Sequence, residues 1–160
     1  MKKIPENIIH FLQAQGCVIV STIDKKGFPH SACKGIVEIT KEGRIYLLDL
    51  YRGRTYSNLK VNPALSITAL DEHRFLGFCL KGKAKIVSLD SASPSLIKAW
   101  EDRITNRLTQ RVLKNLHGDK GHARHPEILL PKPEYLIALE IKEIIDLTPY
   151  HIKQGGIKHG

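Results

Sequence analysis

The sequence predicts a mainly β fold with peripheral α-helices, in which six antiparallel strands form a closed or nearly closed barrel. Runs rich in β-branched residues dominate residues 17–88. The first three runs are joined by short turns, whereas a parallel sheet needs a long crossover, usually a helix, between successive strands. With 160 residues, of which 42% are hydrophobic, the chain is long enough for one domain. We expect that domain at residues 1–150, a helical insertion at about 90–117 and a flexible tail at 151–160.

The first 50 residues predict a helix followed by a meander of three strands. Residues 5–15 have one apolar face, begin with Pro5, which suits a first helical turn, and end before Gly16. Strands are expected at 17–23, 28–40 and 44–50. The turns between them are predicted at 24–27 and 41–43, and each contains a glycine.

A short helix and two more strands are expected next. Residues 55–61 predict a helix with Thr55 as its N-cap, and Asn62-Pro63 ends it because a residue before proline avoids helical angles. Strands follow at 64–70 and 75–87, and Gly77 and Gly82 inside the second indicate a bulge or a sharp bend.

The last third combines a long helix with a closing strand. Ser93-Pro94 predicts the start of a helix within residues 90–116, where apolar residues recur at spacings of three and four. A polar loop is expected at 117–132 and a final strand at 135–147.

Charge and cysteine content limit the classes of partner and compartment. Lys and Arg outnumber Asp and Glu by 25 to 16, which suits a phosphate cofactor, an acidic substrate or nucleic acid. No apolar run approaches the ~20 residues of a membrane span, and the N-terminus lacks a secretory signal, so we expect a cytoplasmic protein. Cys17, Cys33 and Cys79 are odd in number and widely spaced, which favours buried thiols over disulfides or a zinc site.

The strongest chemical pattern follows the third expected strand. Arg52 and Arg54 flank Gly53, and Thr55 opens the short helix. Guanidinium groups bind phosphate oxygens in a bidentate fork, a helix start offers unpaired N–H groups, and glycine permits close approach. The segment predicts either a phosphate site or an ordinary solvated turn.

Three other polar patterns are less specific. In the segment 30–35, Ser31 and Lys34 have opposite parity, so a regular strand directs them to opposite faces, and Lys34 reads either as a cofactor contact or as a surface lysine. The spacing of His117, His122 and His125 is loose for metal ligands, so no metal is expected. The fifth strand carries a basic face formed by Lys81, Lys83 and Lys85. It lacks the interleaved aromatic residues that stack on bases, which favours a solvent-facing surface over nucleic-acid binding.

Four segments in this order resemble the pyridoxamine 5′-phosphate oxidase-related, FMN-binding split-barrel family: residues 27–37, 45–50, 54–63 and 80–84. The most specific is the run Asn58-Leu-x-x-Asn62-Pro63 after Arg54. The resemblance covers roughly residues 17–88, and residues 135–147 fit the closing strand.

The resemblance implies a six-stranded split β-barrel that is usually a homodimer, with FMN in a groove at the subunit interface. It implies flavin contacts from the second strand and from the backbone at the end of the third, and phosphate contacts from the basic segment. The residues concerned are Ser31, Ala32 and Lys34; Leu48, Asp49 and Leu50; and Arg54 and Thr55, with Arg52 or Lys34 assisting.

The chain departs from the oxidase that gives the family its name. That enzyme has lysine where this chain has Thr55, and further arginine and histidine positions to which His151 and Lys153 are only loosely similar. We therefore expect an FMN-dependent oxidoreductase acting on an unidentified small substrate. The alternatives are a flavin carrier, electron shuttle or redox sensor, a haem-binding or haem-degrading relative, and a basic nucleic-acid-binding protein.

Overall fold

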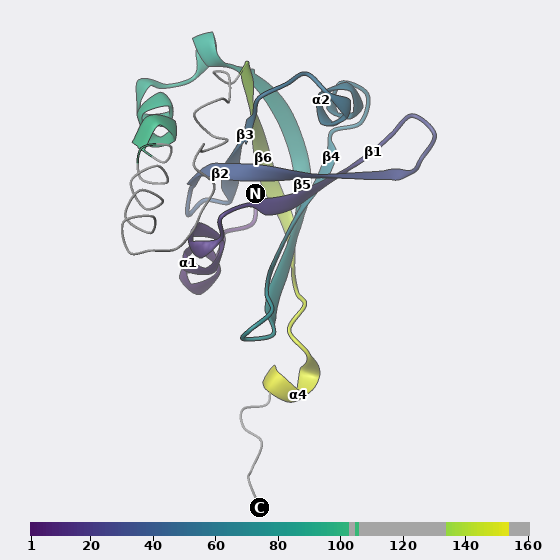
Figure 1. Ribbon diagram of the computed structural model, residues 1–160, viewed down its shortest axis with the longest axis vertical. Helices are drawn as coiled ribbons and strands as arrows, with labels where there is room; N and C mark the ends of the chain where they lie inside the picture. The colour runs from purple at the N-terminus through teal and green to yellow at the C-terminus, as the bar shows by residue number, and fades with distance from the viewer. Residues whose placement is uncertain (103–104, 106–133, 154–160) are drawn as a thin grey trace, which may run out of the picture.

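Six antiparallel strands form a closed barrel in the order β1-β2-β3-β6-β5-β4, which confirms the predicted fold class (Figure 1). The computed structural model describes residues 1–102, 105 and 134–153. The strands are β1 (Val18–Ile23), β2 (Pro29–Ile39), β3 (Arg44–Asp49), β4 (Ala64–Asp71), β5 (Leu76–Ser88) and β6 (Tyr135–Asp146).

Two short turns form where the sequence predicts them, and each requires its glycine. In the β1–β2 turn, Gly27 has φ +86°, and Asp24 Oδ1 accepts hydrogen bonds from the backbone N–H groups of Lys26 and Phe28 at 2.8 and 2.9 Å. In the β2–β3 turn, Gly43 has φ +101°, and a Cβ there would lie 2.0 Å from the carbonyl oxygen of Lys2. Positive φ and close backbone approach both favour glycine.

The pairing of β5 with β6 is irregular at Gly82, where the sequence predicts a bulge or a sharp bend, and the extra residue, Lys142, lies in β6. The pairing of β5 with β6 shifts between Lys81 and Gly82, and a Cβ at Gly82 would lie 1.9 Å from the carbonyl oxygen of Glu140. At Gly77 the pairing with β4 stays regular, and the glycine instead leaves room for the side chain of Leu70.

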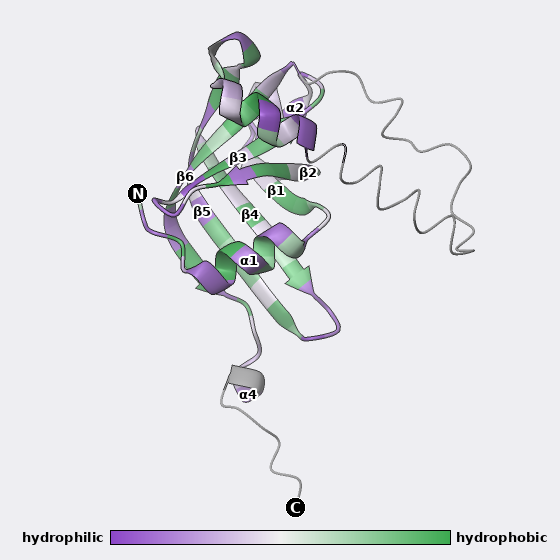
Figure 2. Cartoon of the chain, turned by 90° about the vertical axis from the view of Figure 1, so that its left-hand side faces the viewer, coloured by the Kyte–Doolittle hydropathy of each residue, from purple (hydrophilic) through white to green (hydrophobic). Residues whose placement is uncertain are grey.

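Helices cover parts of the barrel. Helix α1 (Glu6–Ala14) buries its apolar face in the barrel core, where Phe11 meets Phe78 edge to face, and it lies across β4 and β5 in Figure 2. Helix α2 (Arg54–Leu59) lies above the β1–β2 hairpin in Figure 1. After the 3₁₀ helix η1 (Leu89–Ser91), residues 94–102 are helical, and Ser93 Oγ caps their first turn by accepting from Leu96 N–H at 3.3 Å. The rest of the predicted long helix and the loop at 117–132 lie outside the described residues.

The structure corrects two local predictions. Gly53, not Thr55, is the N-cap of α2, no side chain caps the helix, and Thr55 is buried in its first turn. Cys17, which precedes β1, and Cys33 are exposed, and Cys79 is half-buried. Cys33 and Cys79 lie in strands, where alternate residues face opposite sides of a sheet. Cys33 pairs with Ile19 on the outer face, so the apolar run around it was a misleading signal of burial.

The chain continues beyond β6 into one helical turn, α4 (Tyr150–Lys153), at the start of the segment expected to be a flexible tail. Residues 154–160 lie outside the described range. In the part of the chain that the structure describes, no helix has both the length and the apolar character needed to cross a membrane.

Candidate functional site

A pocket of about 450 Å³ opens between the β1–β2 turn and α2. We call it the basic pocket, because three of its residues are Lys or Arg. Residues 24–30 form one wall and residues 54–58 form the other. Its lining consists of Asp24, Lys25, Lys26, Pro29, His30, Arg54, Ser57 and Asn58.

Both walls of the basic pocket are held by hydrogen bonds. Asn58 Nδ2 donates to Thr22 Oγ1 at 3.0 Å, and both side chains are buried, so this bond ties α2 to β1. On the other wall, the Asp24 carboxylate fixes the β1–β2 turn through the backbone N–H groups of Lys26 and Phe28. Asn58 is the first residue of the Asn-Leu-x-x-Asn-Pro run, so this family-like motif has a structural role beside the pocket.

Arg54, Lys25 and Lys26 give the basic pocket its positive charge. Among the described residues, no Asp or Glu side chain forms an ion pair with any of the three. Such cations suit an anionic group, and a phosphomonoester carries about −1.5 to −2 charges at pH 7. Because α2 has only six residues, this assignment rests on the side chains and not on the helix dipole.

Arg52 lies in a different environment, although it is only two residues from Arg54. Its Nε is 2.7 Å from Glu134 Oε2, and its guanidinium carbon lies 5.6 Å from the ring centroid of Tyr56. It does not line the basic pocket. Its charge is therefore already balanced by a carboxylate within the chain.

Lys34 also has a partner within the chain. Lys34 Nζ and the Tyr135 hydroxyl donate to the two carboxylate oxygens of Asp49, which is 3% exposed. Burial, with a contribution from Asp49, raises the pKa of Tyr135, so this phenol stays protonated. With 14% of its side chain exposed, Lys34 is not the surface lysine that the sequence allowed, and we call Lys34, Asp49 and Tyr135 the buried network.

Ser31 lies on the opposite face of β2, as its parity predicts. It is exposed, and its hydroxyl lies 2.9 Å from that of Ser21 on β1. The other predicted contacts, Ala32, Leu48 and Leu50, are half-buried and line neither described pocket.

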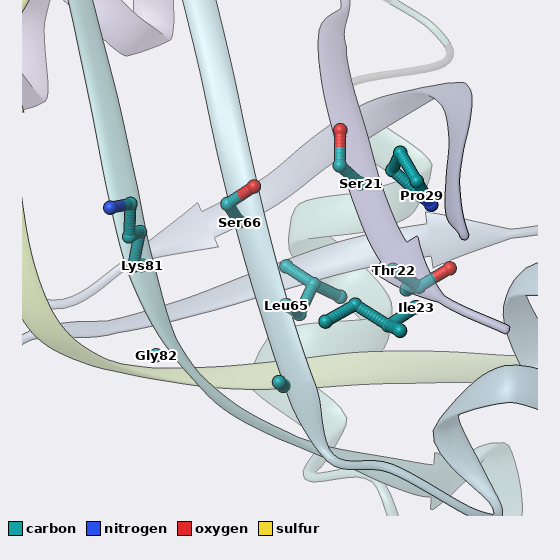
Figure 3. Close-up of a pocket in the computed structure, with 9 residues that line it drawn as sticks. Ser21, Thr22, Ile23, Pro29, Leu65, Ser66, Lys81 and Gly82 are labelled. Atoms are coloured by element: carbon teal, nitrogen blue, oxygen red, sulfur yellow. The ribbon is translucent and has the colours of Figure 1, made fainter. Parts of the chain in front are cut away.

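A second, apolar pocket of about 290 Å³ lies beside the basic pocket and shares Pro29 with it. In Figure 3 the side chains of Ile23 and Leu65 lie together near its middle, and the hydroxyls of Ser21 and Ser66 lie along one edge. Lys81 and Gly82 of β5 complete its described lining together with Thr22 and Ala64.

Of the nine predicted cofactor residues, only Arg54 lines a described pocket. Sequence reasoning did not select Lys25, Lys26, His30, Ser57 or Asn58 as site residues. The usable signal was the Lys-Lys pair in a predicted hairpin turn, but the turn and Arg54 are far apart in the chain, and only the fold brings them together.

Fold and pockets define a small six-stranded β-barrel protein with a basic pocket between the β1–β2 turn and α2. The family model described as pyridoxamine 5′-phosphate oxidase matches residues 4–127. The chain therefore belongs to the pyridoxamine 5′-phosphate oxidase family.

Solved structures with the same fold include proteins with different names. HupZ of Group A Streptococcus is 18% identical, with 91% of this chain and 95% of that chain covered and a TM-score of 0.61. A putative pyridoxamine 5′-phosphate oxidase of Lactobacillus delbrueckii is 16% identical, with coverages of 89% and 93% and a TM-score of 0.59. HutZ of Vibrio cholerae, described as a haem storage protein, is 17% identical, with coverages of 90% and 94% and a TM-score of 0.53. No curated protein matches the chain.

Proposed function

We propose that this chain is an FMN-binding flavoprotein whose basic pocket holds the FMN phosphate through Arg54. The observation that carries the proposal is the position of Arg54, which faces the same pocket as Lys25 and Lys26. FMN joins a phosphomonoester to a flat, largely apolar ring system. A basic pocket that shares Pro29 with an apolar pocket suits a ligand with these two ends.

Bound FMN would supply the hydride- and electron-transfer chemistry, and the protein would supply binding and orientation. In this proposal Arg54 donates charge-assisted hydrogen bonds to the phosphate, and the hydroxyl of Ser57 is a further donor on the same wall. We propose that the protein is an oxidoreductase acting on a small substrate. A flavin carrier, electron shuttle or redox sensor would use the same binding residues.

The visible spectrum of the purified protein and a titration with FMN test the proposal. Flavin bands, or tight uptake of added FMN with quenching of its fluorescence, would support it. A colourless protein that takes up no FMN would refute it. Bleaching of bound flavin by NADH or NADPH, with turnover on an acceptor, would favour the enzyme over the carrier.

The same spectrum tests haem binding, which the name of HutZ brings into consideration. A Soret band in the purified protein, or on titration with haemin, would favour a haem protein on this barrel. Within the described residues, His30 is the histidine that lines the basic pocket. A Soret band that persists when FMN saturates the protein would place haem outside the flavin site.

We further propose that the protein is a homodimer in which the outer face of the barrel at β1, β2 and β4 is covered by a second copy. This face carries the uncharged residues Ile19, Ser21, Ile23, Ser31, Cys33 and Ser66. The two isoleucines are 43% and 40% exposed on it. The apolar pocket opens among the same residues, so a partner would help enclose the cofactor. Sedimentation equilibrium tests this, and a monomer that binds FMN fully would contradict it.

A further inference from the structure

We propose that Lys25 and Lys26 of the β1–β2 turn are phosphate-binding residues that oppose Arg54 across the basic pocket and make the site selective for a phosphomonoester. The proposal rests on the proposed function, because it assigns the ligand of the basic pocket. It adds a binding element from a segment that carries no family-like cofactor motif.

The turn holds both lysines in a defined place. The carboxylate of Asp24 accepts two backbone N–H groups of the turn, and Gly27 supplies the positive φ that closes it. The bond between Asn58 and Thr22 fixes α2 against the strand that leads into the turn. The backbone positions of the cations on the two walls are therefore set before any ligand binds, which lowers the entropic cost of binding.

The charges lining the pocket indicate why the lysines matter. The formal charges of Arg54 and Asp24 cancel, so Lys25 and Lys26 supply the net positive charge of the lining apart from any proton on His30. A phosphomonoester of about −1.5 to −2 charges balances two lysines. The pocket is thus matched to one phosphate, and its volume of about 450 Å³ lies in the range of ~300–1,000 Å³ typical of small-molecule sites.

Location, and not the absence of an ion pair alone, distinguishes Lys25 and Lys26, because Lys2 and Lys3 also form no ion pair with a described acidic residue but do not line the basic pocket. Lys34 pairs with Asp49, Arg52 with Glu134 and Lys81 with Glu143. Asp24 precedes both lysines, but it forms no ion pair with either of them, and its Oδ1 accepts hydrogen bonds from two backbone N–H groups of the turn.

The test compares the double variant K25M/K26M with K2M/K3M, in which two adjacent exposed lysines elsewhere are replaced with the same change of net charge. Dissociation constants for FMN and riboflavin are measured by flavin fluorescence at low and high salt. We expect K25M/K26M to weaken FMN on the order of tenfold, because charge-assisted contacts are lost at a partly exposed site, and to reduce the salt dependence of FMN binding. Riboflavin affinity should not change, and K2M/K3M should behave as the wild type. The variant K25R/K26R should restore the preference for FMN.

Equal FMN affinity in K25M/K26M and K2M/K3M would overturn the proposal, and so would an equal loss for FMN and riboflavin. In both cases the flavin site at Arg54 would stand. If the wild type bound no FMN, the proposed function would fail, and line broadening of inorganic phosphate in ³¹P NMR would decide the role of the turn. Broadening by the wild type and K2M/K3M but not by K25M/K26M would support the lysines as an anion site, and equal broadening by all three would refute it.

Discussion

Two regions of this barrel contain cationic side chains and differ in what balances their charge. In the buried network, Lys34 donates to Asp49, which also accepts from Tyr135, and all three side chains are largely buried. In the basic pocket, Lys25, Lys26 and Arg54 are exposed and form no ion pair with a described acidic residue. A charge that is paired inside the chain contributes to the fold, whereas charges gathered around an open pocket are available to a ligand.

The resemblance to the family assigns Lys34 and Arg54 the same role, whereas the structure places them in different environments. Lys34 and Arg54 are both expected to contact the cofactor, but the structure gives Lys34 a carboxylate partner and leaves Arg54 facing a pocket. Substitutions in the buried network should therefore change the free energy of unfolding, and substitutions of the exposed cations of the basic pocket should change ligand affinity.

The largest effect is expected for Asp49→Ala. Removing the carboxylate leaves the ammonium of Lys34 and the hydroxyl of Tyr135 without their buried partner, and breaking a buried ion pair from one side costs about 3–5 kcal/mol. Urea denaturation measures the loss. The control is Glu143→Ala, which breaks the exposed pair with Lys81 and should cost less than about 1 kcal/mol. Equal losses in the two variants would show that the buried network has no special role in stability.

Arg54→Ala should show the opposite pattern. We expect the binding free energy of FMN to weaken by about 1.5–3 kcal/mol with little change for riboflavin, because only FMN carries the phosphate. The free energy of unfolding should change by less than about 0.5 kcal/mol, since the side chain is exposed. Parallel titrations with the two ligands measure the effect, and Arg74→Ala, in the β4–β5 turn, is the control of the same charge. A similar loss for both ligands would remove Arg54 from the phosphate site.

Asn58→Ala tests the connection between scaffold and pocket. It removes the hydrogen bond to Thr22 and leaves a buried hydroxyl without this partner, so we expect a loss of about 1–2 kcal/mol in the free energy of unfolding. Urea denaturation measures it, with Ser57→Ala, whose hydroxyl bonds the Gly53 carbonyl at the surface, as the control. If Asn58→Ala cost no more than Ser57→Ala, the walls would not depend on this bond.

Local signals in the sequence were sufficient for most of the fold. Turns such as 24–27 and 41–43 depend on residues adjacent in the chain, so Gly27 and Gly43 could be read directly. The site depended on long-range pairing. Whether a charged side chain turns toward the barrel or the solvent depends on its neighbours across the sheet, and the sequence contains no local sign that Lys34 meets Asp49.

The environments of the two arginines of the basic segment could not be predicted from the sequence either, although these residues are only two positions apart. Arg52 and Arg54 stand on either side of Gly53, and their order alone gave no reason to separate them. Their different environments depend on Glu134, which β6 brings beside Arg52, and on the β1–β2 turn, which lies beside Arg54. The family-like motif located the segment, and tertiary structure determined which arginine faces the pocket.

Arg52→Met should have the smallest effect and is the strictest test of the comparison. Its pair with Glu134 is exposed, and such pairs contribute about 0–1 kcal/mol, so the free energy of unfolding should change little. Methionine can keep part of the contact with Tyr56, and FMN and riboflavin should bind as in the wild type. The measurement is the same pair of titrations as for Arg54→Ala, with the two variants side by side. If Arg52→Met weakened FMN as much as Arg54→Ala, then Arg52 would have to leave Glu134 when the phosphate binds, and an ion pair within the chain would no longer separate structural cations from those that bind ligand.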